Sequence, residues 1–113
     1  MEIETNREGQ VTIVMLRGVV TLGESAREVS ELLGGLLEHD DGSVLVDLSA
    51  VDHVDSTGLG ELVGYLQRFS EQGRRMALLS PPDRVRNLLR LTKLDEVFPT
   101  YHDRDEAVRS MQV

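Results

Sequence analysis

Ser56 stands where the sequence pattern changes from a buried strand to a helix. The apolar run 44–48 predicts the strand, and apolar residues at steps of three and four from Leu59 predict a helix over 56–71. The first backbone N–H groups of a helix have no acceptor inside the helix, and the helix end carries about half a positive charge. The junction therefore suits a side-chain cap made by Ser56 or Asp55, or a phosphate group carried by Ser56.

A phosphate at this position would change the charge of the junction strongly. Phosphorylation of Ser56 adds about −1.5 to −2 charges. Asp52 and Asp55 lie close by in the sequence and would repel the new group. Such a group can switch an interface without refolding the domain. Thr57 carries the same hydroxyl chemistry, so chemistry alone does not separate it from Ser56.

Three glycines follow within the predicted helix, although glycine weakens helices. They are Gly58, Gly60 and Gly64. Gly60 and Gly64 are four residues apart, so they share one face of the helix. Two explanations are open: a flat, accessible docking face beside the serine, or close packing of the helix inside the domain.

Length and charge narrow the classes of function. The chain has 113 residues, which predicts one domain over 1–113, and it contains no cysteine. Its 20 acidic and 12 basic residues give a net charge of −8, which disfavours nucleic-acid binding and suits a basic protein partner. The arginines at 74–75 and at 84, 86 and 90 are expected on solvated faces. No signal peptide and no apolar run long enough for membrane insertion is visible, so we expect a soluble, cytoplasmic protein.

Residues that could support catalysis or bind a metal are present but scattered. His39, His53 and His102 each lie beside an aspartate at distant positions, so no metal site is expected. Asp52 and Asp55 could be imagined as a pair of catalytic carboxylates, but no nucleophile and orienting base accompany them. No phosphate-binding loop or dinucleotide motif occurs. We therefore expect no hydrolase activity and no cofactor.

Asp47, on the predicted buried strand, invites comparison with the phosphoacceptor aspartate of a receiver domain. A receiver would also need an acidic pair after its first strand and a lysine late in the chain. The strand ends here in Arg17 and Gly18, and Lys93 follows a helix. Asp47 is therefore interpreted as a solvent-facing or loop-bonding residue near the end of its strand.

Apolar periodicity predicts elements in the order β-β-α-β-α-β-α-β-α. Strands that alternate with helices imply an α/β domain with a small mixed, mostly parallel sheet of about four to five strands and about four helices, mainly on one face or unevenly on two. Gly18 is expected to end the second strand, Asp83 to cap the third helix, and Leu91 to extend its apolar stripe. The expected strands are 1–9, 10–17, 43–48, 76–79 and 97–101, and the expected helices are 26–37, 56–71, 84–91 and 106–111.

The run Asp55-Ser56-Thr57-Gly58-Leu59-Gly60, placed after a strand, resembles the signature of the anti-sigma factor antagonists of the STAS domain family. The run 88–94, followed by Val97 and Phe98, is similar to the third helix and last strand of that family. The resemblance covers nearly the whole chain, and the predicted order of elements agrees with the fold of the family.

This resemblance implies a binding protein that is not an enzyme and is regulated by phosphorylation. The unphosphorylated protein would bind an anti-sigma factor that is also a serine kinase, and so release a sigma factor. Phosphorylation of the serine after the aspartate, here Ser56 rather than Thr57, would break the complex, and a PP2C-type phosphatase would restore binding. The expected partner-binding residues are Thr21, Asp55, Ser56, Thr57, Gly58, Gly60, Glu61 and Gly64.

One loop departs from the pattern of the family. Many members carry a Gly-Glu-apolar-Asp run after the second strand, whereas the matching run here is 18–21, with Val19 and Thr21 in place of the two acids. Glu24 offers a carboxylate three residues further on. The change bears on which kinase the protein recognises. It leaves open a second function, that of a STAS-like scaffold or regulatory subunit, for example of a lipid-transport ATPase, without a phosphoswitch.

Overall fold

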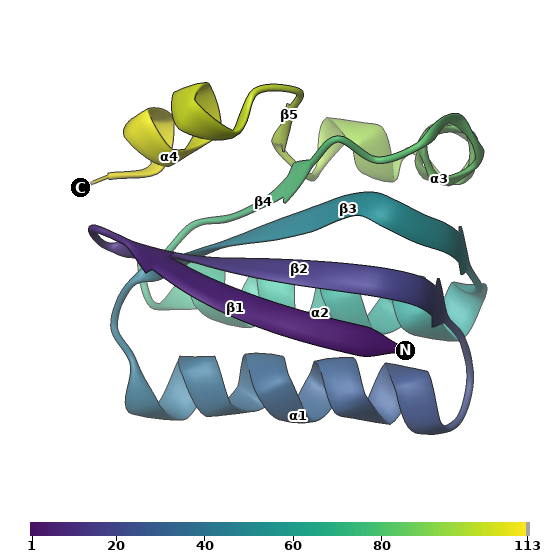
Figure 1. Ribbon diagram of the computed structural model, residues 1–113, viewed down its shortest axis with the longest axis horizontal. Helices are drawn as coiled ribbons and strands as arrows, with labels where there is room; N and C mark the ends of the chain where they lie inside the picture. The colour runs from purple at the N-terminus through teal and green to yellow at the C-terminus, as the bar shows by residue number, and fades with distance from the viewer. Residues whose placement is uncertain (113) are drawn as a thin grey trace.

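A five-stranded sheet with the strand order β1-β2-β3-β4-β5 runs through the centre of the protein (Figure 1). The computed structural model describes residues 1–112. Only β1 is antiparallel to its neighbour, so the sheet is mixed and mostly parallel, as predicted. The strands are β1 (Glu2–Glu8), β2 (Val11–Val20), β3 (Ser43–Val54), β4 (Met76–Leu79) and β5 (Thr100–Tyr101). The helices are α1 (Glu24–His39), α2 (Ser56–Glu71), α3 (Asp83–Leu91), the short 3-10 helix η1 (Leu94–Glu96) and α4 (Arg104–Met111).

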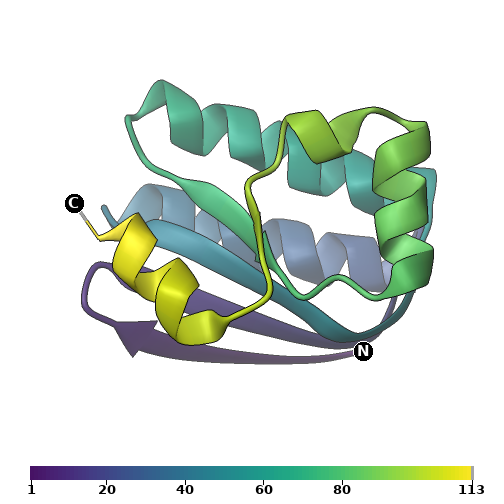
Figure 2. The same ribbon diagram turned by 90° about the horizontal axis from the view of Figure 1, so that it is seen from above.

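The helices cover the two faces of the sheet unequally. Figure 2 looks onto the side of the sheet that carries α4, with α1 behind the sheet. The larger core lies between the sheet and α1 and α2, and it contains Leu33 and Phe69, both fully buried. α3 adds Val85 and Leu89 to this same core. The smaller core lies under α4, where Met111 packs on the other face of the sheet. The uneven two-sided arrangement is one of the two that the sequence predicts.

The predicted order of elements is confirmed, but β2 and β3 are longer than expected. Gly18 does not end β2; it adopts a φ of 110°, and the strand continues to Val20 past a shift in register. On β3, Val51 and Val54 are buried, and Val54 pairs with Val20. The stretch 51–54, beyond the expected end of this strand at residue 48, is therefore part of β3. Both strands gain length together because each supplies the hydrogen-bonding partner of the other.

Several smaller expectations around α3 are wrong. Pro82 occupies the N-cap, and Asp83 is the first helical residue, where its carboxylate pairs with Arg86. Leu91 is 82% exposed and does not belong to the core stripe. β5 contains only two residues, because the N–H groups of Val97 and Phe98 donate to the Leu94 carbonyl and not to a strand neighbour. On β3, the interpretation of Asp47 as a solvent-facing or loop-bonding residue near the strand end is also wrong: Asp47 is half-buried within the longer strand and accepts a hydrogen bond from the Ser49 N–H of the same strand.

Arg74 is not on a solvated face, contrary to expectation. It is 8% exposed, and its guanidinium donates hydrogen bonds to backbone carbonyls at the end of α1 and in the following turn. Its neighbour Arg75 is exposed. Charge and spacing give no sign of this difference, because it depends on carbonyl groups more than 30 residues away in the sequence.

No helix within residues 1–112 combines the length and the apolar composition that a membrane span requires.

Candidate functional site

Asp55 is the residue that caps α2. Its Oδ1 accepts a hydrogen bond from the Gly58 N–H at 2.8 Å, which satisfies one of the free donors of the helix start. Its Oδ2 accepts a second hydrogen bond from the Leu22 N–H, also at 2.8 Å. One carboxylate thus joins the start of α2 to the loop between β2 and α1. Of the two capping residues that the sequence allows, the structure selects Asp55.

Ser56 is therefore free of the capping role. It is the first residue of α2, it is exposed, and within residues 1–112 its hydroxyl makes no hydrogen bond. Thr57, the other candidate phosphoacceptor, is half-buried. The hydroxyl of Ser56 is thus the more accessible of the two, at a helix end that favours anions.

The three glycines of α2 have different surroundings. A Cβ atom on Gly58 would lie 2.4 Å from the carbonyl oxygen of Val20, so the close approach of α2 to β2 requires glycine at this position. A Cβ atom on Gly60 or Gly64 would have no neighbour within 4 Å. Close packing explains Gly58, whereas Gly60 and Gly64 lie on an open face together with the half-buried Glu61.

The loop between β2 and α1 lies beside this helix start and carries exposed apolar groups. Thr21 is half-buried, and its backbone is tied to Ser25, whose Oγ accepts the Thr21 N–H at 2.9 Å. Leu22 in this loop is 77% exposed, and Val19, near the end of β2, is 43% exposed. Sequence reasoning missed Leu22; the signal was a lone leucine between Thr21 and Gly23 in a predicted loop.

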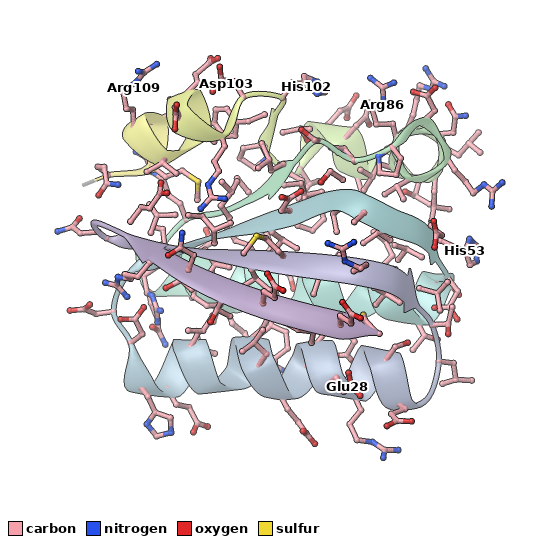
Figure 3. All side chains as sticks on the ribbon, in the orientation of Figure 1. Glu28, His53, Arg86, His102, Asp103 and Arg109 are labelled. Carbon is pink, nitrogen blue, oxygen red and sulfur yellow. The ribbon has the colours of Figure 1, made fainter. Side chains whose placement is uncertain are left out.

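A hollow of about 430 Å³ separates the start of α2 from α3. Most of its surface is apolar, and the exposed Leu91 stands at its margin. His53, at the end of β3, projects outward beside it (Figure 3). The lining residues are His53, Val54, Asp55, Ser56, Arg84, Val85, Asn87, Leu88 and Leu91. Two exposed leucines thus belong to the site: Leu91 on α3 lines this hollow with Ser56, and Leu22 in the loop is bonded through its N–H to the neighbouring Asp55.

The electrostatics of the site depend mainly on Asp55. Hydrogen bonds from the backbone N–H groups of Gly58 and Leu22 lower the pKa of the Asp55 carboxyl from its ordinary value. The group therefore stays ionised and keeps its cap at any pH near neutral. Within residues 1–112 no three His, Asp or Glu side chains are placed to hold a metal ion, and His39, His53 and His102 do not meet.

The lowered pKa of Asp55 predicts that stability depends on this residue at acid pH. A carboxylate whose pKa is lower in the folded state stabilises the protein above its unfolded pKa of about 4, and this contribution is lost as the pH falls through the folded value. The Asp40 carboxyl behaves in the same way, since a hydrogen bond from Arg7 lowers its pKa. We expect Asp55→Asn to unfold with a weaker dependence on pH below about 4 than the unchanged protein. Urea unfolding between pH 7 and pH 3 measures this, and an identical slope for the two proteins would contradict the prediction.

Comparison with known proteins gives a consistent result. The family model described as the STAS domain matches residues 2–107. The chain is 38% identical over 69 residues to a Thermotoga neapolitana protein named as a candidate anti-sigma factor antagonist, a match that spans 61% of each chain. It is 27% identical over 98 residues to the anti-sigma-B factor antagonist of Staphylococcus aureus, covering 87% of this chain and 90% of that one. The crystal structure of a candidate anti-sigma factor antagonist from Thermotoga maritima superimposes with a TM-score of 0.88 at 27% identity, covering 96% of this chain and 93% of that one.

Proposed function

Because the chain belongs to the STAS domain family, we propose that it is an anti-sigma factor antagonist, a regulator that acts by binding and not by catalysis. The observation that carries the proposal is the exposed Ser56 hydroxyl at the start of α2, next to an Asp55 that performs the capping. Replacing or phosphorylating the Ser56 side chain leaves the Asp55 cap of α2 in place. The site can therefore change its charge while the fold stays the same.

In the proposed mechanism the unphosphorylated protein binds an anti-sigma factor with serine-kinase activity and so frees a sigma factor. Phosphorylation of Ser56 adds about −1.5 to −2 charges to the surface that the partner contacts, and repulsion between this charge and acidic groups of the partner opposite Ser56 breaks the complex. A PP2C-type phosphatase removes the phosphate and restores binding. The open face at Gly60 and Gly64 supports a partner that approaches α2 closely, because no side chain stands in the way there.

The test is phosphorylation by the cognate kinase. The protein is incubated with the kinase and ATP, and the product is mapped by mass spectrometry. Phosphate on Ser56, absent from Ser56→Ala and retained in Thr57→Ala, is the expected result. Ser56→Ala should bind the anti-sigma factor like the unphosphorylated protein, whereas Ser56→Asp should bind at least about tenfold more weakly because of charge repulsion. Phosphate at another residue, or equal affinities of the two variants, would overturn the proposal.

One observation favours a second function. The stretch 18–22, which spans the end of β2 and the start of the following loop, lacks the acids that accompany the switch in many family members, and its exposed residues, Val19 and Leu22, are apolar. An apolar surface suits a permanent interface, such as that of a STAS-like scaffold or of a regulatory subunit of a lipid-transport ATPase. Stable co-purification with such an ATPase, unchanged by added ATP, would support this alternative. Loss of the complex on addition of ATP and kinase would support the antagonist.

The exposed leucine of this loop should contribute to partner binding in either case. Leu22→Ala removes a side chain that is 77% exposed, so we expect little change in the free energy of unfolding. Affinity for the anti-sigma factor should fall by about tenfold, as for an apolar contact at the centre of an interface. Val97→Ala is the control, since Val97 is also exposed but lines a different hollow together with Tyr101 and Met111. Calorimetric titration measures both variants, and equal losses would contradict the role of Leu22.

A further inference from the structure

We propose that Arg84 binds the phosphate of phosphorylated Ser56 within the same chain, and that phosphorylation thereby withdraws Arg84 from the partner-binding surface. This inference rests on the proposed phosphorylation of Ser56 and adds a second component to the switch. The phosphate does not only add negative charge at the start of α2. It also pairs with the positive charge of Arg84 on the neighbouring α3, so that this charge no longer attracts the partner.

The first observation is that Arg84 differs from the other arginines of α3. Arg86 pairs with Asp83, and Arg90 donates a hydrogen bond to Asn87. Arg84, in the first turn of the helix, has no hydrogen bond or ion pair within residues 1–112. Its guanidinium is therefore available to an anion without first breaking another contact.

The second observation is that Arg84 and Ser56 line the same hollow. Arg84 enters it from α3, and Ser56 enters it from the start of α2. Arg86 and Arg90 line a different hollow, which includes His102 but not Ser56. A phosphate on the Ser56 oxygen would thus project into a space that a flexible arginine side chain shares. The guanidinium matches a phosphate through paired N–H donors, which makes the contact stronger than a simple charge contact.

The charges around the hollow increase the need for this cation. Asp52 on β3 and Asp55 at the cap are both close to Ser56 in the sequence, and Glu61 lies on the next turn of α2. Against these carboxylates, His53 and Arg84 are the basic residues that line the hollow. Because the remaining lining is mostly apolar, few other polar groups there compete with a phosphate for Arg84.

A consequence for the partner follows. In the unphosphorylated protein the guanidinium of Arg84 is an exposed positive charge, unpaired within residues 1–112, on a molecule whose net charge is negative. We therefore expect the partner to place a carboxylate opposite Arg84. The phosphate of Ser56 competes with that carboxylate for the same guanidinium. Release of the partner would then combine repulsion with the loss of one attractive contact.

The experiment uses phosphoserine installed genetically at position 56, so that no kinase is needed. The second ionisation of the phosphate is followed by ³¹P NMR in the otherwise unchanged protein, in Arg84→Gln, and in the matched control Arg86→Gln. We expect the midpoint to lie about 0.5 pH unit higher in Arg84→Gln, because a nearby cation favours the dianion. Arg86→Gln should titrate like the unchanged protein, and Arg84→Lys should restore part of the shift. Equal midpoints for all four proteins would overturn the proposal.

A second measurement separates this inference from the proposed function. Unphosphorylated Arg84→Gln should bind the anti-sigma factor about five- to tenfold more weakly than the unchanged protein, with Arg86→Gln as the control. If the kinase fails to modify Ser56 while the ³¹P shift is present, the antagonist mechanism is wrong and the phosphate contact stands. If the kinase modifies Ser56 but Arg84→Gln changes neither the midpoint nor the affinity, the antagonist mechanism stands and the contact with Arg84 is wrong.

Discussion

Arg74→Ala should lower the free energy of unfolding by about 3–5 kcal/mol, the largest effect expected for a single substitution of a charged residue in this protein. The Nε of Arg74 donates to the carbonyl oxygen of Gly42 at 2.6 Å, and its two terminal nitrogens donate to those of Leu37 at 3.0 Å and Leu36 at 2.8 Å. Leu36 and Leu37 are in the last turn of α1, where carbonyls lack partners inside the helix, although the Leu36 carbonyl also accepts the N–H of the C-cap residue Asp40 at 3.2 Å. The substitution leaves all three carbonyls without this donor.

The surroundings of Arg74 explain why losing its side chain should destabilise the fold strongly. The guanidinium lies 4.4 Å from the centre of the Phe69 ring and is 8% exposed, and desolvation lowers its pKa from the ordinary value. No carboxylate pairs with it within residues 1–112; the negative end of the α1 dipole and the carbonyls take that role. Arg74 thus connects the end of α1, the turn at Gly42 and the end of α2.

Urea unfolding followed by circular dichroism measures this prediction. Arg75→Ala is the matched control, because Arg75 is exposed and its side chain makes one hydrogen bond within residues 1–112, from the guanidinium to the Ser110 carbonyl at 2.8 Å. We expect Arg75→Ala to change the free energy of unfolding by less than about 1 kcal/mol. Arg74→Lys keeps the charge but not the three-way donor geometry, so it should be intermediate. A loss at Arg74 no larger than that at Arg75 would contradict the prediction.

Gly58→Ala should destabilise the protein by about 2–3 kcal/mol and weaken partner binding at the same time. The added Cβ would lie 2.4 Å from the Val20 carbonyl oxygen and 2.9 Å from a methyl group of Val20. Because the first of these atoms is backbone, β2 and α2 must move apart. The Gly58 N–H is also the donor to Asp55, so the cap of α2 is disturbed together with the loop that Asp55 holds.

Gly60→Ala and Gly64→Ala are the controls for this prediction, and they separate stability from binding. Neither added Cβ has a neighbour within 4 Å, so each substitution should stabilise the helix by about 0.5–1 kcal/mol. If the open face of α2 receives the partner, both should nevertheless reduce affinity for the anti-sigma factor. Thermal unfolding and a binding titration of all three variants decide the point. Affinity unchanged in both Gly60→Ala and Gly64→Ala would show that the partner does not contact this face.

The sequence predicts most of the fold because local patterns decide most of it. The helix over 56–71 and the strand over 76–79 are confirmed at both ends, since apolar spacing and flanking glycine mark them. The ends of β2 and β3 were missed because they depend on each other. Asp52 and His53 look like a loop in isolation, and only pairing with β2 makes 51–54 a strand.

The sequence alone predicts where the candidate site lies but not the contacts within it. The position of Ser56 at a strand-to-helix junction could be predicted from local pattern. The choice of Asp55 as the cap could not, because half of its role is a hydrogen bond to Leu22, 33 residues earlier in the chain. The hollow shared by Ser56 and Arg84 could not be predicted either, because it is formed by α2 and α3, which are separated in the sequence by β4. Contacts between distant segments carry no local signal.

Because Asp55 caps the helix and Ser56 does not, the two positions are expected to evolve under different constraints. Asp55 holds the helix start and the adjoining loop, so its replacement affects folding. Ser56 makes no side-chain hydrogen bond within residues 1–112, so its replacement leaves the fold intact. Under the proposed mechanism, one substitution at position 56 converts a regulated binder into a permanent one without passing through an unstable protein. The response to phosphorylation can therefore be gained or lost among related chains while the domain persists unchanged.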